Sequence, residues 1–379
     1  MKLPDYLCDG KLPYPKGVAP IQAEVEVVTP MFLAGVDQQN IINEGPRSAS
    51  IKGLLRWWWR ATTKICDEKV MKLREGEIFG DTKEQNSGHG QGCLVRTRPV
   101  GQWRSSKPDI RDADLQYLLG MGLYNFKTGV LRPAVFAGER FILNITPQSE
   151  EHRLELKIAL EAMLLFGGAG SRSRRGWGSF SKIHKDVQEV RSSISTLLEN
   201  LPKGAKLWSH LSPHSIWHCE EATTWEQALK SVGSKMKNLR LKLGGQQAPY
   251  GPDHDLVSDF LHKSKPLARA PWRCAFGIPH NYFFKSSKKK VDFHWTDGDR
   301  RASPVILHVA RCKVGFVSVA LLLNGPFLPE GKGIDAVEYK DKTGHTRQPD
   351  FRAPKAYFEL LKGGDLNMVV SKLNQLGQT

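Results

Sequence analysis

The segment that decides the fold is residues 150–179, EEHRLELKIALEAMLLFGGAGSRSRRGWGS. Its first part, Glu150 to Phe166, contains no glycine or proline and has apolar residues such as Leu154, Ile158 and Met163 at helical spacing, which predicts an amphipathic helix. Five glycines and three arginines are gathered in the dozen residues that follow. The segment therefore predicts a helix that leads directly into a flexible, arginine-bearing loop.

Outward from this helix, the alternation of apolar and polar residues predicts strands on both sides. In residues 21–27 apolar and polar side chains alternate strictly, and Thr29-Pro30 ends the predicted strand. A helix is predicted after it. The predicted elements of the first half are strands at 21–27, 93–98, 140–145 and 179–183, and helices at 51–64 (capped by Ser50), 68–75 and 150–166. Apart from the short helix 68–75, their order is β-α-β-β-α-β, which is typical of a ferredoxin-like or RRM-like domain.

The second half repeats this order more loosely. We predict strands at 208–219, 272–276, 305–310 and 314–322, helices at 223–243, 353–361 and 366–376, and long loops at 244–252 and 286–301. A junction is predicted around residues 188–204. The sequence thus predicts an α+β protein with two ferredoxin-like (RRM-like) domains in tandem, residues 1–186 and residues 187–379, the second with a helical C-terminal part.

The charge of the chain indicates a polyanionic partner. The 379 residues include 55 Lys and Arg against 39 Asp and Glu, a net charge of +16, and the excess is spread over both halves. Such a balance favours nucleic acid as the partner. No apolar run is long enough for a membrane span, no secretory signal is visible, and the six cysteines form no Cys-x-x-Cys pair. We therefore expect a cytoplasmic protein with reduced cysteines and no membrane association.

A basic stripe marks the predicted helix 51–64. Lys52, Arg56, Arg60 and Lys64 recur every four residues, so they share one helix face. Either an anionic ligand compensates this face, or it is a solvated face balanced by the acidic residues 68, 75 and 77. Three consecutive tryptophans, 57–59, cannot all face one core. At least one should stack on a base, a partner subunit or an arginine, and Trp58 is taken as the RNA-binding candidate.

The glycine-rich loop is the second candidate site. Glycines allow a backbone to approach phosphate closely, and arginines form forked hydrogen bonds to its oxygens. The loop fits neither a Walker nor a Rossmann nucleotide motif. The candidates for phosphate-backbone binding here are Gly168, Gly170, Ser171, Arg172, Ser173, Arg174 and Arg175. If the loop is unpacked, replacing its arginines by Ala should lower RNA affinity without unfolding the chain.

A family resemblance rests on these same strings. The loop, placed between a second helix and a final strand, resembles the signature of the RAMP proteins of CRISPR systems. Residues 50–61, SIKGLLRWWWRA, residues 31–38, MFLAGVDQ, and residues 166–179, FGGAGSRSRRGWGS, resemble the first Cmr subunit of type III-B effector complexes, as do FGIP at 276–279, RASP at 301–304 and FLP at 327–329. The similarity extends over about residues 21–330; one departure is Trp57, where the family is expected to have Phe.

This resemblance implies two ferredoxin-like domains and a non-catalytic role. It implies binding of guide (CRISPR) RNA and target RNA near the 3′ end of the guide, beside other Cmr RAMP subunits, in antiviral defence. Cutting of target RNA would belong to other subunits, and no cofactor or metal is expected. Carried over to this chain, the resemblance implies RNA contacts by Lys52, Arg56, Arg60, Arg172, Arg174 and Arg175.

The remaining clusters are weaker. His210, His214 and His218 are four residues apart and are more typical of a satisfied or exposed group than of a metal site. The acidic pairs at 253–255 and 297–299 are read as solvated turns, and the basic run 288–290 has aromatic neighbours and is a weaker candidate for RNA contact. The alternative function is a RAMP-family endoribonuclease that processes guide precursor, with His89 as the histidine to test.

Overall fold

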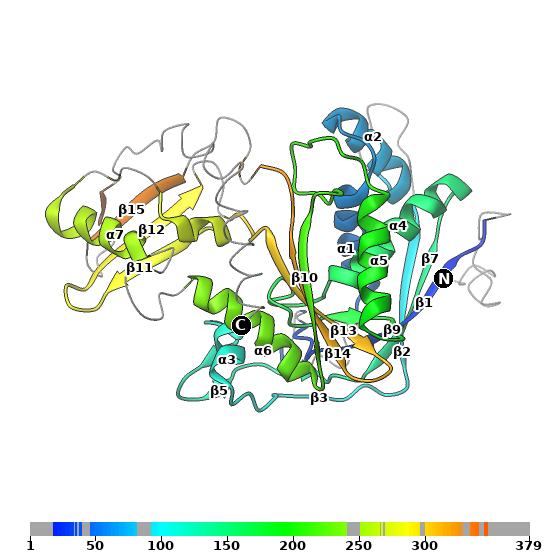
Figure 1. The fold of residues 1–379 in the computed structure, drawn as a ribbon, viewed down its shortest axis with the longest axis horizontal. Coiled ribbons are helices and arrows are strands. Elements are labelled where there is room, and N and C mark those ends of the chain that lie inside the picture. Colours follow the sequence, from blue (N-terminus) through cyan, green and yellow to red (C-terminus); the bar gives the residue numbers. More distant parts are fainter. Residues whose placement is uncertain are drawn as a thin grey trace, which may run out of the picture.

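The fold was analysed in a computed structural model, which describes residues 18–347 except 34, 36–37, 40–45, 82–91, 241–250, 266, 268–269, 296–299, 327, 329–333 and 341–344. Three four-stranded sheets and the helices packed on them dominate this part of the chain (Figure 1). The protein is therefore α+β, as predicted. None of the helices in the described ranges is both long and apolar enough to cross a bilayer.

The first sheet has the predicted β-α-β-β-α-β order. Its strands are β1 (Ile21–Val27), β2 (Leu94–Val100), β7 (Arg140–Thr146) and β8 (Phe180–Ser181), and its crossing helices are α1 (Ser48–Thr62) and α4 (Glu150–Phe166). The strands lie in the order β2-β7-β1-β8, and every neighbouring pair is antiparallel. Ile21, Val25 and Val27 are buried, as the alternation predicted, and they join one core with α1 and α4.

Helix α1 begins and ends earlier than predicted. It starts at Ser48, so Ser50 lies inside its first turn and is not the cap. The helix ends at Thr62, because Thr63 has extended backbone angles and donates its N–H to the carbonyl of Trp59. Lys64 consequently lies beyond the helix, and the basic stripe on α1 has three members.

Several short elements are inserted into this first domain. Helix α2 (Glu68–Phe79) follows α1, and the segment between β2 and β7 contains β3 (Ser105–Ser106), α3 (Ala113–Leu119), β4 (Tyr124–Asn125), β5 (Gly129–Val130) and β6 (Ala134–Val135). The sequence indicated α2 and missed the others, because two-residue strands and a two-turn helix have too little periodicity to detect.

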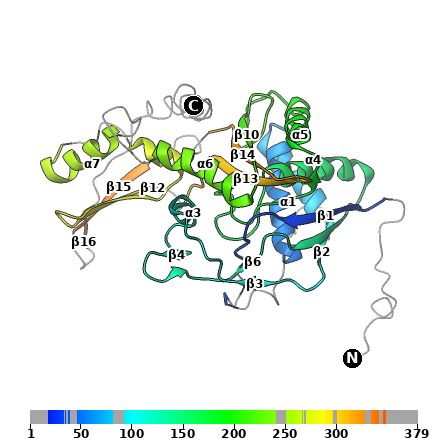
Figure 2. The same ribbon diagram turned by 60° about the horizontal axis from the view of Figure 1, so that its bottom comes forward.

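The second sheet is covered on both faces. Its strands are β9 (Ile183–His184), β10 (Ile216–Ala222), β13 (Val305–Cys312) and β14 (Phe316–Leu322), in the order β10-β14-β13-β9, with helices α5 (Val187–Glu199) and α6 (Trp225–Arg240). Helix α6 lies on one face of this sheet, and α4 and α5 lie on the other (Figure 2). Along β13, Ile306 and Ala310 join the core of α4 and α5, whereas Leu307 and Val309 join the core beneath α6. This explains why β13 is buried along almost its whole length while β1 alternates.

The connectivity of the second sheet differs from a simple repeat of the first. Strand β9 pairs in parallel with β13, and the chain order is β-α-β-α-β-β. The strand predicted at 208–219 forms only from Ile216, because Ser212 and Ser215 close a turn after Leu211 with reciprocal hydrogen bonds. The division into domains at residue 186 and the ferredoxin-like character of the second half stay predictions.

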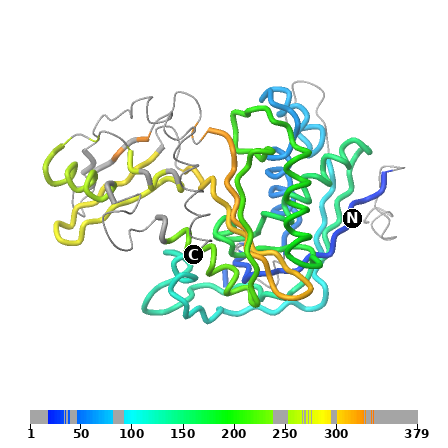
Figure 3. The backbone as a smooth tube through the Cα atoms, viewed as in Figure 1, coloured from blue at the N-terminus to red at the C-terminus, as the bar shows by residue number. Residues whose placement is uncertain are grey.

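A third sheet makes a separate small core that the sequence did not predict. Its strands are β11 (His280–Phe284), β12 (Lys289–Trp295), β15 (Ile334–Lys340) and β16 (His345–Arg347), in that order, with helix α7 (Gly251–Lys263) and a 3-10 helix at Trp272–Phe276. In Figure 3 this part lies to one side of the other two four-stranded sheets. The predicted strand 272–276 is therefore wrong, and the predicted loop 286–301 is wrong over residues 289–295, which form β12; residues 296–299 lie outside the described part. The predicted helices at 353–361 and 366–376 and most of the loop at 244–252 lie outside the described residues.

The backbone of the glycine-rich loop packs directly against residues 30–33, which follow β1. Gly178 donates its N–H to the carbonyl of Pro30 at 3.0 Å, and Ser171 donates to that of Phe32 at 2.9 Å. Gly178 has φ +68°, and a Cβ built there would lie 2.0 Å from the carbonyl oxygen of Ala169. The glycine is needed because a side chain would collide with neighbouring backbone.

We expect Gly178→Ala to lower the free energy of unfolding by at least about 3 kcal/mol, since it combines a left-handed backbone with a backbone collision. Gly138→Ala is the matched control, because Gly138 also has positive φ (+92°) but nothing lies within 4 Å of a Cβ there. Its cost should be about 1–2 kcal/mol. Urea unfolding followed by circular dichroism measures both, and equal losses would contradict the close approach.

Candidate nucleic-acid interface

Arg174 of the glycine-rich loop is turned into the protein. Its guanidinium donates to the carbonyl oxygen of Ser303 at 2.6 Å and lies over the ring of Trp57, 5.0 Å from the centroid. Burial, with a smaller contribution from Arg301, lowers the pKa of Arg174 to about 10. Arg174 therefore links the loop, helix α1 and the start of β13, and this geometry leaves it little capacity to bind phosphate.

Arg172 and Arg175 bind backbone carbonyls at the end of helix α3. Arg172 donates to the carbonyls of Leu119 at 2.8 Å and Met121 at 2.5 Å. Arg175 approaches those of Tyr117 and Leu118 at 3.5 and 3.4 Å. These carbonyls would otherwise be unsatisfied at a helix C-terminus, where positive charge is also favourable. The two arginines thus cap α3.

These contacts correct the expectation of an unpacked loop. All three arginines make structural hydrogen bonds, and Gly168 and Ser173 are also used internally. Gly168 forms a bridge with Ser179, and the carbonyl of Ser173 accepts from Gly176. A backbone carbonyl and a phosphate oxygen are both good acceptors for a guanidinium. The glycines and arginines from which phosphate binding was predicted therefore form hydrogen bonds that stabilise the fold.

A group of exposed or partly exposed cations lies at the rim of this loop. Gly170 is exposed, and Ser171 accepts a 2.8 Å hydrogen bond from Arg132. Burial lowers the pKa of Arg172, and the nearby charges of Arg300 and Arg132 lower it further. In the part of the chain that the structure describes, no carboxylate pairs with these three arginines. We call Arg132, Arg172 and Arg300 the rim arginines.

Sequence reasoning missed Arg132 and Arg300. They lie 40 residues before and 128 residues after Arg172 in the chain, in segments without a glycine-rich motif. Only the fold brings them to the loop. The RASP string at 301–304 begins directly after Arg300 and was the one signal near it.

The basic stripe on α1 is largely compensated within the protein. Arg56 and Arg60 both donate from Nε to the same carboxylate oxygen of Glu75 at 2.5 Å, and the Glu75 side chain is only 3% exposed. The prediction that acidic residues 68, 75 and 77 balance the basic stripe is therefore confirmed for Glu75 only. Glu68 pairs with Lys72 instead, and Glu77 pairs with Arg74. Two cations share one anion, so Arg56, Arg60 and Lys52 still leave a positive excess here.

The three tryptophans divide between core and surface. Trp58 and Trp59 are 3% and 1% exposed, and Trp58 stacks on Phe166. The RNA-stacking role expected for Trp58 is therefore wrong for this structure, because neither ring face is open. Trp57 is half-buried, and the guanidinium of Arg174 lies over its ring. The prediction that at least one tryptophan stacks on a base, a partner subunit or an arginine is therefore confirmed for an arginine.

A short hairpin beside the rim arginines exposes apolar side chains. Met121, whose carbonyl accepts from Arg172, is 81% exposed, and Phe126 at the β4–β5 turn is 89% exposed. Lys127 follows Phe126 and is also exposed. Exposed aromatic rings next to cations are the components of single-strand binding surfaces.

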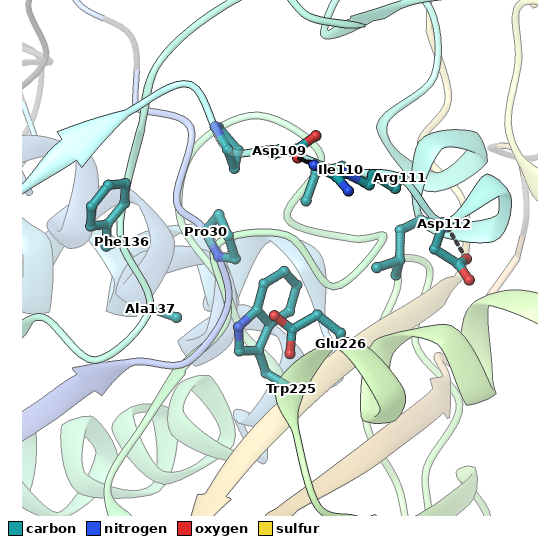
Figure 4. A pocket seen from close by; sticks show the side chains of 11 residues that line it. Pro30, Asp109, Ile110, Arg111, Asp112, Phe136, Ala137, Trp225 and Glu226 are labelled. Atoms are coloured by element: carbon teal, nitrogen blue, oxygen red, sulfur yellow. Dashed lines mark hydrogen bonds and ion pairs between the residues drawn. The ribbon is translucent and has the colours of Figure 1, made fainter.

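A separate cleft has the opposite electrostatic character. It has a volume of about 420 Å³ and is lined by Pro30, Phe136 and Trp225 together with Asp109, Asp112 and Glu226 (Figure 4). Asp112 caps α3 and pairs with Lys230 at 2.7 Å, and Asp109 pairs with Arg111 at 2.7 Å. Its carboxylates make the cleft unfavourable for a phosphate backbone.

The histidine and acidic clusters do not assemble. His210 is buried and bridges to Asn324, His214 lies in the following turn, and His218 lies on β10. Within the described ranges, no three His, Cys, Asp or Glu residues are placed to hold a metal ion. Asp253 lies in the first turn of α7 and Asp255 two residues further along the helix, so neither is in a loop. Residues 297–299 and His89 lie outside the described part.

Comparisons with known proteins agree with this geometry. The RAMP superfamily model matches residues 24–181, which include the first sheet and the glycine-rich loop. This part of the chain is therefore similar to the RAMP superfamily.

Two Cmr1 subunits are similar to the chain in sequence. Cmr1-1 of Pyrococcus furiosus is 30% identical over 183 residues, 46% of this chain and 51% of the relative. Cmr1-2 of the same organism is 26% identical over 195 residues, 45% of this chain and 96% of the relative. The chain thus spans about half the length of Cmr1-1.

Solved structures share the fold. The crystal structure of apo Cmr1 from Pyrococcus furiosus matches with a TM-score of 0.52 and 19% identity, over 83% of this chain and 90% of that one. A chain of the type III-B Cmr-beta complex bound to cognate target RNA matches with a TM-score of 0.53 and 11% identity, over 94% and 98%.

We expect Arg174→Ala to lower the free energy of unfolding by about 2 kcal/mol or more, because it removes a charged hydrogen bond and a cation–π contact from a buried site. Arg140→Ala is the control, since Arg140 forms an exposed pair with Glu24 and should change stability by less than about 0.5 kcal/mol. Urea midpoints of the two variants measure this. If both unfold like the unaltered chain, Arg174 has no structural role.

Proposed function

We propose that the chain is a non-catalytic RNA-binding subunit of a type III-B CRISPR (Cmr) effector complex. It would bind guide RNA and target RNA near the 3′ end of the guide, beside other Cmr RAMP subunits. The observation that carries this proposal is the group of rim arginines, which has no carboxylate partner among the described residues. The Cmr1 relatives and the shared fold support the assignment to a Cmr complex.

The rim arginines suit a phosphate backbone better than a single small anion. Arg132 and Arg172 come from different segments and are each held by hydrogen bonds to Ser171, Leu119 and neighbouring groups. The exposed ring of Phe126 lies on the β4–β5 hairpin, and Arg172 binds the carbonyl of Met121 in the turn that leads into this hairpin. Cations for phosphates and a ring for bases together favour single-stranded RNA, bound with little sequence preference.

Two of the described histidines, His184 and His308, are unsuited to a nuclease role. His184 and His308 are 0% and 1% exposed, and burial lowers their pKa values to about 4 and about 3. Both side chains are therefore neutral near pH 7 and closed off from substrate. General acid–base cleavage needs a histidine that reaches the RNA.

We expect the protein to bind an unstructured RNA oligonucleotide with a slope of log affinity against log salt of about −3, which corresponds to about four phosphate contacts. Replacing Arg132 and Arg300 together by Gln should make the slope shallower by about 1.4. Arg111→Gln is the control, because Arg111 is exposed but pairs with Asp109 at the acidic cleft. Fluorescence anisotropy at several salt concentrations measures the slopes; a flat dependence for the unaltered protein would refute the electrostatic interface.

We also expect the isolated protein with Mg²⁺ to leave guide precursor, target RNA and ATP unchanged. Its effect should appear on assembly, as weaker target binding by complexes that lack this subunit but retain a competent cutting subunit. Gel analysis of labelled RNA, with and without the subunit, tests both points. Cleavage by the isolated protein that His89→Ala abolishes would establish the endoribonuclease instead.

A further inference from the structure

The β11–β12 hairpin of the third sheet exposes an aromatic side chain that the fold does not need. Phe283 and Phe284 are neighbours on β11, so their side chains lie on opposite faces of the sheet. Phe284 packs against the core of the third sheet and contacts the rings of His254 and His262. Phe283 is 58% exposed. Leaving a phenylalanine in water gives up the free energy of its burial.

Uncompensated cations flank this ring. Lys285 follows it by two residues, and Lys288 lies in the turn, and both are exposed. Neither forms an ion pair with any residue in the described ranges. Lys290, opposite Phe283 in the strand register, is compensated, because its ammonium group lies 2.7 Å from Asp292. The exposed positive charge of the hairpin is therefore concentrated at its tip.

The hairpin is held in place by helix α7. The ammonium group of Lys289 donates to the carbonyl of Leu261, and Nε2 of His262 lies 2.7 Å from Oγ of Ser287. The tip is thus fixed on a helix end, so a ligand there would meet a preformed surface.

We propose that Phe283, Lys285 and Lys288 form a second contact for single-stranded RNA, separate from the rim arginines. The ring offers a face on which a base stacks, and the two ammonium groups lie where adjacent phosphates would pass. This inference rests on the proposed function in requiring that the protein binds RNA. Charge complementarity favours RNA as the occupant.

The test uses the full chain and a fluorescein-labelled 20-nucleotide oligouridylate as the probe. Phe283→Ala should weaken binding by about fivefold or more, the lower end of the loss for one stacked base, with little change in the salt slope. Lys285→Gln with Lys288→Gln should instead make the slope shallower by about 1.4. Phe283→Tyr keeps an aromatic ring and should bind like the unaltered chain.

The matched control is the tip of the β13–β14 hairpin. Val314 is 91% exposed and follows Lys313, so Lys313→Gln with Val314→Ala removes a comparable lysine and apolar side chain from another sheet. This variant should bind the probe unchanged. Circular dichroism melting shows whether Phe283→Ala is folded; if it is not, the lysine variant and Phe283→Tyr decide the question.

The outcomes separate this inference from the proposed function. If the unaltered chain fails to bind the probe, both fall. If it binds and the Phe283 and lysine variants match the control, only the second contact falls. Equal RNA binding accompanied by loss of self-association or of protein capture in the hairpin variants would assign the hairpin to a protein partner and overturn the inference.

Discussion

The close approach of two backbones, made possible by glycine, is the constraint on which the rest of this structure depends. The glycine-rich loop lies against residues 30–33 with no space for side chains at Gly170 or Gly178. Only at this separation can the loop also reach the second sheet, where Leu307 donates its N–H to the carbonyl of Arg174 and Val309 donates to Oγ of Ser179. The loop is therefore the joint between the two large sheets before it is a binding surface.

The same constraint decides which cations are available to a ligand. Arg174 and Arg175 point inward because backbone carbonyls near the loop need donors, and Arg56 and Arg60 share the buried carboxylate of Glu75. The cations of the loop and of α1 that stay available to a ligand are therefore fewer than the number of basic residues in these segments suggests. Arg172 belongs to both groups, since it holds Met121 and lies near two other arginines.

The sequence predicted those features that depend on periodicity. Helix α4, the alternating strand β1 and the buried strands β13 and β14 were all visible, because their patterns follow from local geometry and burial. The use of the loop arginines was not, because the same residue types suit carbonyls and phosphates. Arg132 and Arg300 were missed because they are distant in sequence, and β12 was missed because its lysines and polar residues resemble a loop. The prediction that tryptophans 57–59 cannot all face one core agrees with the half-buried position of Trp57, but which ring is the more exposed one depended on where Phe166 and Arg174 lie.

The continuity of one hydrophobic core across the first two sheets has a consequence for how the protein unfolds. Residues of β1, α1, α4 and α5 and one face of β13 and β14 form a single buried cluster. Neither sheet can lose its packing without exposing apolar surface of the other. The two sheets should therefore lose structure as one cooperative unit, whereas the third sheet, which has its own small core, is free to melt as an independent one.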